Sequence, residues 1–228
     1  MTEARRQFRR ELAELEARAL GAIELVIDEL DRTIEALEHQ DIELGQIVAQ
    51  TDLELDARCM EIHQGLLSLL ALQAPVAGDL RMVAALLHVI KHAERMGNQC
   101  VSIVALLPLS GHEPPVDAQI LERALAMGRF ARAEVVQCRR SFAERDVAMA
   151  EDLVKRDSEV NRLNREIFRL AIEAGDDSDV REWAMIMTLV ARAFERVGDN
   201  AVDIGEQTAF LVTGLFREFS DGAHVTVA

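Results

Sequence analysis

Three acidic residues stand at four-residue intervals late in the chain, in the segment FERVGDNAVDI (residues 194–204). Glu195, Asp199 and Asp203 would share one side of a helix, because each step of four residues rotates the side chain by only about 40°. Carboxylates this close repel one another unless a cation or an arginine neutralises them. Oxygen ligands of this kind suit hard cations, so the spacing predicts a metal site.

More acidic residues lie on the segment that would form the second helix of each half of the chain. Two neighbouring helices that each supply carboxylates to a shared surface can hold a hard cation. The predicted metal-site residues are Glu195, Asp199, Asp203, Asp157 and Glu159 in the second half, and Glu94, Asn98, Asp52 and Asp56 in the first half.

The first half is the weaker candidate for metal binding. Asn98 and Ser102 occupy the positions that correspond to Asp199 and Asp203, so only Glu94 keeps its charge on that helix. Fewer anionic ligands mean weaker binding of a cation. If one half binds metal, we expect it to be the second.

The same acidic spacing is also compatible with a solvated helix surface. Acidic pairs four residues apart are common on exposed helices, and Arg192 and Arg196 lie near enough in sequence to neutralise part of the charge. Spacing alone leaves both interpretations open.

Motifs of common enzyme classes are missing from the sequence. The six histidines show no Glu-x-x-His pair, which di-iron helical bundles use as ligands. There is also no phosphate-binding P-loop, no dinucleotide-binding glycine pattern and no G-x-S-x-G motif. We therefore expect a protein that is not an enzyme.

Long helices must position these acidic residues. The 228 residues include 8 Phe, 1 Trp, no Tyr and only 4 Pro, while Ala, Leu, Glu and Arg, which enter helices at low cost, are abundant. Apolar residues recur at three- and four-residue spacings, and Pro, Gly and Asp mark the breaks. The pattern predicts six helices, over about residues 4–38, 41–73, 79–107, 117–144, 146–175 and 180–218.

The two halves of the chain repeat one another. Residues 36–56 align with residues 141–161 at an offset of 105, and residues 93–103 align with residues 194–204 at an offset of 101. The predicted fold class is therefore all-α, with two tandem antiparallel three-helix bundles packed end to end or side by side. We place the first repeat at residues 1–110, the second at 111–218 and a frayed tail at 219–228.

Charge and cysteine content restrict the partners and the compartment. The chain has 25 Lys and Arg against 40 Asp and Glu, a net charge of −15. This disfavours nucleic acid and anionic membranes as direct partners and suits cations or a basic patch on another protein. Three widely spaced cysteines, no secretory signal and no long apolar run predict a cytoplasmic protein without direct membrane insertion. We also expect a homodimer.

Three segments carry a resemblance to a known family. LLALQAPVAGDLRMV (residues 69–83), AERMGNQCVSI (residues 93–103) and FERVGDNAVDIGEQTAFLVTG (residues 194–214) resemble the PhoU family of bacterial phosphate regulators. The resemblance covers both repeats, from about residue 6 to residue 214. It implies two three-helix bundles that bind iron, or another divalent metal such as manganese, zinc or magnesium, through acidic residues that match Glu195, Asp199 and Asp203.

The resemblance also implies a regulator rather than a catalyst. PhoU-like proteins act as adaptors between the phosphate ABC transporter and its sensor histidine kinase, and they restrain phosphate uptake and the phosphate-starvation response. This chain is accordingly expected to be a negative regulator with those partners. The alternatives are a structural or metal-storing helical bundle without phosphate signalling, and a carboxylate-metal enzyme.

Overall fold

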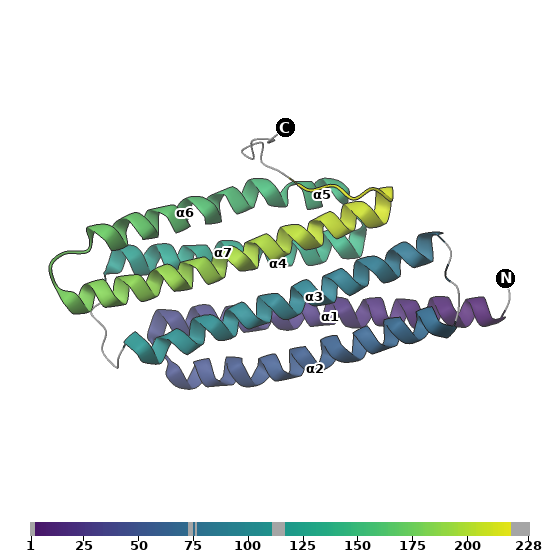
Figure 1. Cartoon of the computed structure of the whole chain (residues 1–228), viewed down its shortest axis with the longest axis horizontal. Helices are drawn as coiled ribbons and strands as arrows, with labels where there is room; N and C mark the ends of the chain where they lie inside the picture. Colours follow the sequence, from purple (N-terminus) through teal and green to yellow (C-terminus); the bar gives the residue numbers. More distant parts are fainter. Residues whose placement is uncertain (1–2, 73–74, 76, 111–116, 220–228) are drawn as a thin grey trace.

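Every regular element in the described part of the chain is a helix, as predicted. The computed structural model describes residues 3–72, 75, 77–110 and 117–219 (Figure 1). The elements are α1 (Glu3–His39), α2 (Ile42–Leu72), α3 (Ala77–Leu106), the short 3₁₀ helix η1 (Leu107–Ser110), α4 (Ala118–Glu144), α5 (Val147–Glu151), α6 (Leu153–Glu173) and α7 (Ser178–Thr213). None of these helices is long and apolar enough to cross a membrane, within the residues described.

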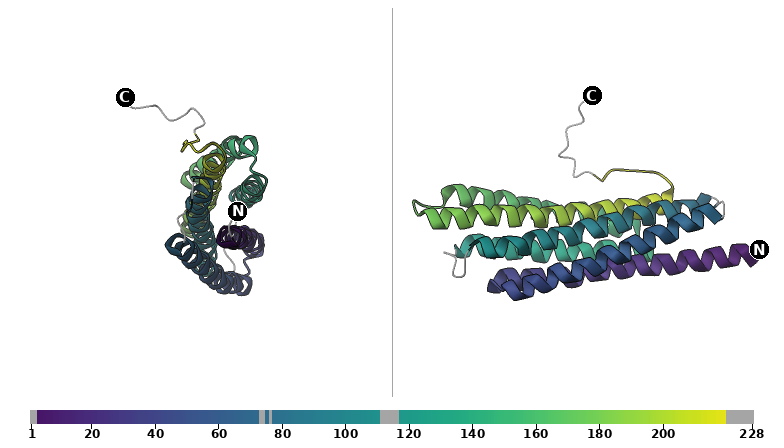
Figure 2. Two further views of the ribbon diagram at one scale, coloured as in Figure 1. Left: turned by 90° about the vertical axis from the view of Figure 1, so that its right-hand side faces the viewer. Right: turned by 60° about the horizontal axis from the view of Figure 1, so that its bottom comes forward.

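The two three-helix repeats lie side by side rather than end to end. Helices α1, α2 and α3 form the first bundle, and α4, α6 and α7 form the second, with α5 packed on α4 and α7. The bundles meet where α3 packs along α7 and α1 packs along α4. All the long helices therefore run along one common axis (Figures 1 and 2). The helices α2, α3, α7 and α6 lie next to one another in that order and form one layer of the molecule; α1 and α4 form the other.

A single hydrophobic core joins both repeats. Buried residues from every long helix form one connected cluster, in which Phe142 and Phe194 are the largest fully buried side chains. The boundary predicted near residue 110 falls between η1 and α4, and residues 111–116 lie outside the described part of the chain.

Aspartates begin the helices where the sequence predicted them. The Asp41 carboxylate accepts a hydrogen bond from the Leu44 amide at 2.9 Å, and the Asp146 carboxylate accepts one from the Met149 amide at 2.9 Å. Each bond satisfies an amide in the first turn that has no partner within its own helix.

The single helix predicted for residues 146–175 is wrong, because the chain breaks into α5 and α6 at Asp152. The Gln137 side chain on α4 donates to the Met149 carbonyl oxygen at 2.8 Å. In an unbroken helix, the Met149 carbonyl oxygen would instead accept a hydrogen bond from the Leu153 amide. On α7, Gly205 leaves room for the Ala150 carbonyl, which lies only 3.2 Å from where a Cβ would stand. Contacts with two other helices thus determine the break.

The last helix is shorter than predicted and ends at Thr213 rather than near residue 218. Gly214 adopts a left-handed conformation (φ 76°), and its amide donates to the Phe210 carbonyl at 2.7 Å. This is a common way for a helix to end, because glycine has no Cβ to oppose a positive φ. Beyond it the Phe216 ring stacks on Phe210 with ring centres 3.8 Å apart. The predicted tail lies outside the described residues except for Phe219, whose amide donates to Glu206 at 2.7 Å.

Candidate functional site

Each repeat gathers four carboxylates from its three long helices. The first cluster, Glu29, Asp52, Asp56 and Glu94, comes from α1, α2 and α3. The second cluster, Glu134, Asp157, Glu195 and Asp199, comes from α4, α6 and α7. Burial and the charge of neighbouring members raise the pKa of Glu29, Asp52 and Asp56 in the first cluster and of Glu134 and Asp199 in the second.

A glycine on the third helix makes room for each cluster. At Gly198 on α7, a Cβ would stand 2.6 Å from Glu134 Oε2 and 2.7 Å from Asp157 Oδ1. At Gly97 on α3, a Cβ would meet the Asp52 carboxylate and would lie 3.1 Å from Glu29 Oε2. Because only hydrogen fits there, the carboxylates of the other two helices reach the backbone of the third.

Glu29 and Glu134 lie at the bottom of the clusters and are fully buried. Neither carboxyl group has a hydrogen-bond partner among the described residues. Burial raises the pKa of each to about 8; the next cause is the neighbouring Asp52 for Glu29 and Asp157 for Glu134. Both groups are thus largely protonated at neutral pH when no cation is present.

The carboxylates nearer the surface are also perturbed. Burial, followed by Asp56 and Glu94, raises the pKa of Asp52 to about 6. Partial burial and the neighbouring Glu195 raise the pKa of Asp199. Each cluster therefore concentrates negative charge that a proton or a cation would neutralise.

The two buried glutamates were missed from the sequence. Glu29 lies among apolar core positions of the first helix, between Val26 and Leu30, and nothing in its local spacing marks it as a ligand. The repeat contained a signal, because Glu29 and Glu134 are separated by the same offset of 105 that relates Asp52 to Asp157. Extending that alignment back to the first helix of each repeat would have found both.

Six of the nine predicted residues join a cluster: Asp157, Glu195 and Asp199 in the second repeat, and Asp52, Asp56 and Glu94 in the first. Glu159 does not, since it is exposed on α6 and bonds to Arg162 at 2.9 Å. Asp203 lies next to the second cluster, close enough to raise the pKa of Asp199, but its carboxylate faces the contact between the repeats, 3.3 Å from the buried His92 of α3. Asn98 is exposed and donates to the Glu94 carbonyl at 3.0 Å.

The two clusters have the same number of carboxylates, although the sequence favoured the second. Asn98 on α3 corresponds to Asp199 on α7, which removes one charge from the first cluster. Asp56 on α2 corresponds to Asn161 on α6, so the first cluster has a carboxylate at this position where the second has none. The charge count therefore gives no reason to rank one repeat above the other.

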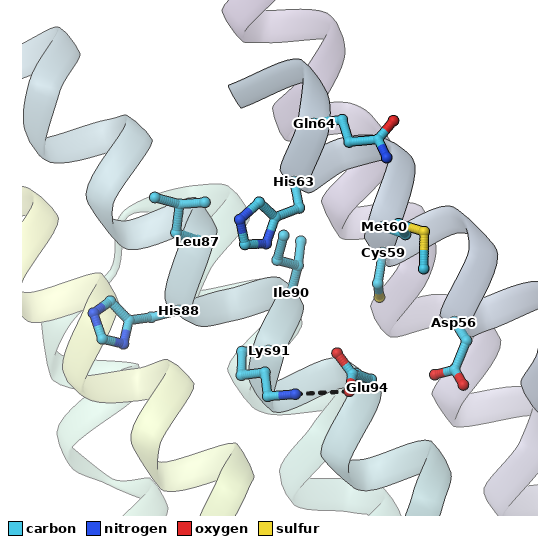
Figure 3. A pocket seen from close by; sticks show the side chains of 10 residues that line it. All are labelled: Asp56, Cys59, Met60, His63, Gln64, Leu87, His88, Ile90, Lys91 and Glu94. Atoms are coloured by element: carbon cyan, nitrogen blue, oxygen red, sulfur yellow. Dashed lines mark hydrogen bonds and ion pairs between the residues drawn. The ribbon is translucent and has the colours of Figure 1, made fainter. Parts of the chain in front are cut away.

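The first cluster opens into a cavity of about 650 Å³ between α2 and α3. Asp56 and Glu94 face its lower end from the two helices, and the Lys91 ammonium bonds to Glu94 at 2.7 Å (Figure 3). The rest of the lining combines the apolar side chains of Cys59, Met60, Leu87 and Ile90 with the polar side chains of His63, Gln64 and His88. A small cation has a route from solvent to this cluster.

The chemistry of both clusters fits a divalent cation. Carboxylate oxygens are the preferred ligands of hard cations, and several are buried without a hydrogen-bond partner. Within the described residues, no three His, Cys, Asp or Glu side chains are already grouped so that they could hold a metal ion. Binding would therefore require the carboxylates to turn toward a shared ion and to release the protons that Glu29 and Glu134 hold.

We expect Gly198→Ala to lower the free energy of unfolding by about 1 kcal/mol. Overpacking costs about 1–3 kcal/mol, and the better helix propensity of alanine returns at most about 1 kcal/mol. Urea unfolding measures the difference. Gly21→Ala is the matched control, because its Cβ would meet only Arg58 Nη1, at 3.7 Å. If both variants are stabilised equally, the carboxylates of Glu134 and Asp157 do not lie as close to Gly198 as described.

Comparison with known proteins gives a consistent result along the chain. The family model described as the PhoU domain matches residues 21–107 and 124–208, one match in each repeat. A relative in Clostridium acetobutylicum is 28% identical over 95% of this chain and 99% of its own length. One in Deinococcus radiodurans is 33% identical over 86% of this chain and 90% of its own length. Both are named phosphate-specific transport system accessory protein PhoU homologs.

Solved structures of similar proteins share the fold. The crystal structure of the phosphate transport system regulatory protein PhoU from Streptococcus pneumoniae matches with a TM-score of 0.84 at 22% identity, over 92% of this chain and 99% of that one. PhoU from Pseudomonas aeruginosa matches with a TM-score of 0.82 at 23% identity, over 91% of this chain and 100% of that one.

Proposed function

Since the chain belongs to the PhoU family, we propose that it is an accessory protein of a phosphate transport system and a negative regulator of phosphate uptake. The observation that carries this proposal is the match of the PhoU domain to both repeats. Relatives named as accessory proteins of phosphate transport also match over nearly their whole length. The likeness is therefore to entire accessory proteins and not to one helical module.

The proposed mode of action is that of an adaptor in the cytoplasm. It would contact subunits of the phosphate ABC transporter and the sensor histidine kinase, and would hold the phosphate-starvation response off when phosphate is plentiful. Long helical surfaces and a net charge of −15 suit contacts with basic surfaces of other proteins. In this proposal the chain binds partners and catalyses no reaction. It also forms a homodimer, which light scattering of the purified protein would check.

Deleting the gene is expected to derepress alkaline phosphatase and phosphate uptake in cells grown with excess phosphate. The reason is that a negative regulator is needed when the signal to stop uptake is present. Both activities are measured in the deletion strain and after the gene is restored. Unchanged activities, in a strain that also lacks any second PhoU-like gene, would reject the regulator role.

We propose further that the two clusters bind iron, or another divalent metal such as manganese, zinc or magnesium. Glu134, Asp157, Glu195 and Asp199 would supply oxygen ligands in the second repeat, and Glu29, Asp52, Asp56 and Glu94 would do so in the first. A bound cation would neutralise the carboxylates and tie three helices of a repeat together. Buried carboxylate oxygens without hydrogen-bond partners support this assignment.

Adding manganese to metal-free protein should raise its melting temperature at neutral pH. A ligand that binds only the folded state stabilises it by mass action, by about 2.7 kcal/mol at a hundred times its dissociation constant. Differential scanning fluorimetry over a range of manganese concentrations measures the shift, with sodium chloride at equal ionic strength as the control. Equal shifts with both salts would reject metal binding at the clusters.

A further inference from the structure

A second cavity, of about 670 Å³, lies between α4 and the broken helix α5–α6, and no carboxylate of either acidic cluster lines it. The break at Asp152 forms one of its walls, where Ala148 and Met149 stand opposite Ala133 and Val136 of α4. This volume is typical of small-molecule sites, which span about 300–1,000 Å³.

Three arginines line this cavity in a strongly acidic protein. Arg132 and Arg140 come from α4 and Arg156 comes from α6, against two aspartates, Asp146 and Asp152. Asp146 already accepts the Met149 amide at 2.9 Å. Asp152 lies 3.6 Å from Arg156. Both aspartates are therefore engaged, and three arginines against two aspartates leave the cavity lining with a net positive charge.

The ion pairs that hold Arg140 and Arg156 are exposed and easily exchanged. Arg140 bonds to Glu144 at 2.8 Å, yet 62% of its side chain is exposed; for Arg156 the exposed fraction is 51%. Arg132 is held more firmly, because it donates two hydrogen bonds to the Asp31 carboxylate of α1. Exposed ion pairs contribute little to stability, so a multivalent anion can replace the surface carboxylates at small cost.

The first repeat has the same three-helix fold without the three arginines that line this cavity. At an offset of 105, Arg132, Arg140 and Arg156 correspond to Ile27, Glu35 and Thr51 of the first repeat. There the second helix continues as α2 without a break at the corresponding position. The cationic cavity is thus a feature of the second repeat only, within the part of the chain that the structure describes.

We propose that this cavity binds a small anion that carries two or more neighbouring phosphate groups. The guanidinium group pairs with phosphate through two parallel hydrogen bonds, and three such groups around one cavity exceed what a single phosphate needs. The cavity is large enough for a nucleotide as well as for an inorganic polyphosphate. This proposal does not depend on the regulator role or on metal binding.

Calorimetric titration of the full chain, freed of metal with EDTA, tests the proposal with three probes: pyrophosphate, ATP and adenosine. We expect saturable binding of pyrophosphate or ATP and none of adenosine. Tighter binding of ATP would identify nucleotides as the class of ligand that the cavity binds. Tighter binding of pyrophosphate would identify inorganic polyphosphates instead.

The variant Arg140→Glu with Arg156→Thr introduces the residues of the first repeat and should weaken binding at least about tenfold. Both side chains are exposed, so circular dichroism and melting temperature should stay unchanged. The control Arg165→Glu reverses the charge of an exposed arginine of α6 outside the cavity lining and should change binding less than about twofold. No saturable binding of either phosphate probe, or equal losses in the variant and the control, would overturn the proposal.

Discussion

The metal-free Glu134→Gln variant is expected to exceed the unmodified chain in stability by about 2–4 kcal/mol near pH 9, and to differ little from it near pH 5. Glutamine has the shape of a protonated glutamate but cannot ionise. In the unmodified chain, burial and Asp157 raise the pKa of Glu134 from 4.5 to about 8. Above that pH the folded state must hold a buried charge that the unfolded chain leaves in water.

The sign follows from proton linkage. Because the pKa of Glu134 is higher in the folded chain, the folded state binds more protons between pH 4.5 and about 8. Stability therefore falls as the pH rises through that interval, and the contribution of the neutral group is lost above about pH 8. Urea unfolding at both ends of the interval, with EDTA present, measures the difference.

Two further variants make this result specific. Glu29→Gln should behave in the same way, because the pKa of Glu29 is also raised to about 8 by burial and by Asp52. Glu159→Gln is the control, since that side chain is exposed and paired with Arg162. A Glu134→Gln variant no more stable than the unmodified chain near pH 9 would mean that the glutamate is not buried as described.

The second large effect is expected from the pair Asp157→Ala and Asp199→Ala, which should weaken manganese binding in the second repeat at least about tenfold and also relieve repression of alkaline phosphatase. The pair removes one carboxylate from α6 and one from α7. A cation could then no longer tie those helices to Glu134. Calorimetry measures the loss of binding, and phosphatase activity in excess phosphate measures the loss of repression.

Glu159→Ala is the matched control for this pair. It removes a carboxylate from α6, the helix that carries Asp157, but the Glu159 side chain is exposed and lies outside the cluster. It should leave both manganese binding and repression intact. Full repression by the double variant, once its loss of manganese binding is established, would separate metal from regulation and leave the clusters with a structural role.

The sequence by itself determined the helices, the repeat and the surface carboxylates. Apolar spacing gave the helices, because a helix of an antiparallel bundle must bury one side whatever its neighbours are. The offsets of 105 and 101 gave two three-helix bundles, and the four-residue spacing placed Glu195 and Asp199 together. These features depend on relations within one helix or between two copies of the same segment.

Only the tertiary structure decided which carboxylates meet. Asp203 has the same spacing as Asp199, yet the packing of α3 on α7 places it beside His92. Glu134 shows no such spacing, yet Gly198 lets it reach Asp157 from another helix. The helix break at Asp152 likewise depends on Gln137 and Gly205 of other helices. Periodicity fixes where a side chain lies around its own axis, whereas the neighbours it meets depend on how the helices pack.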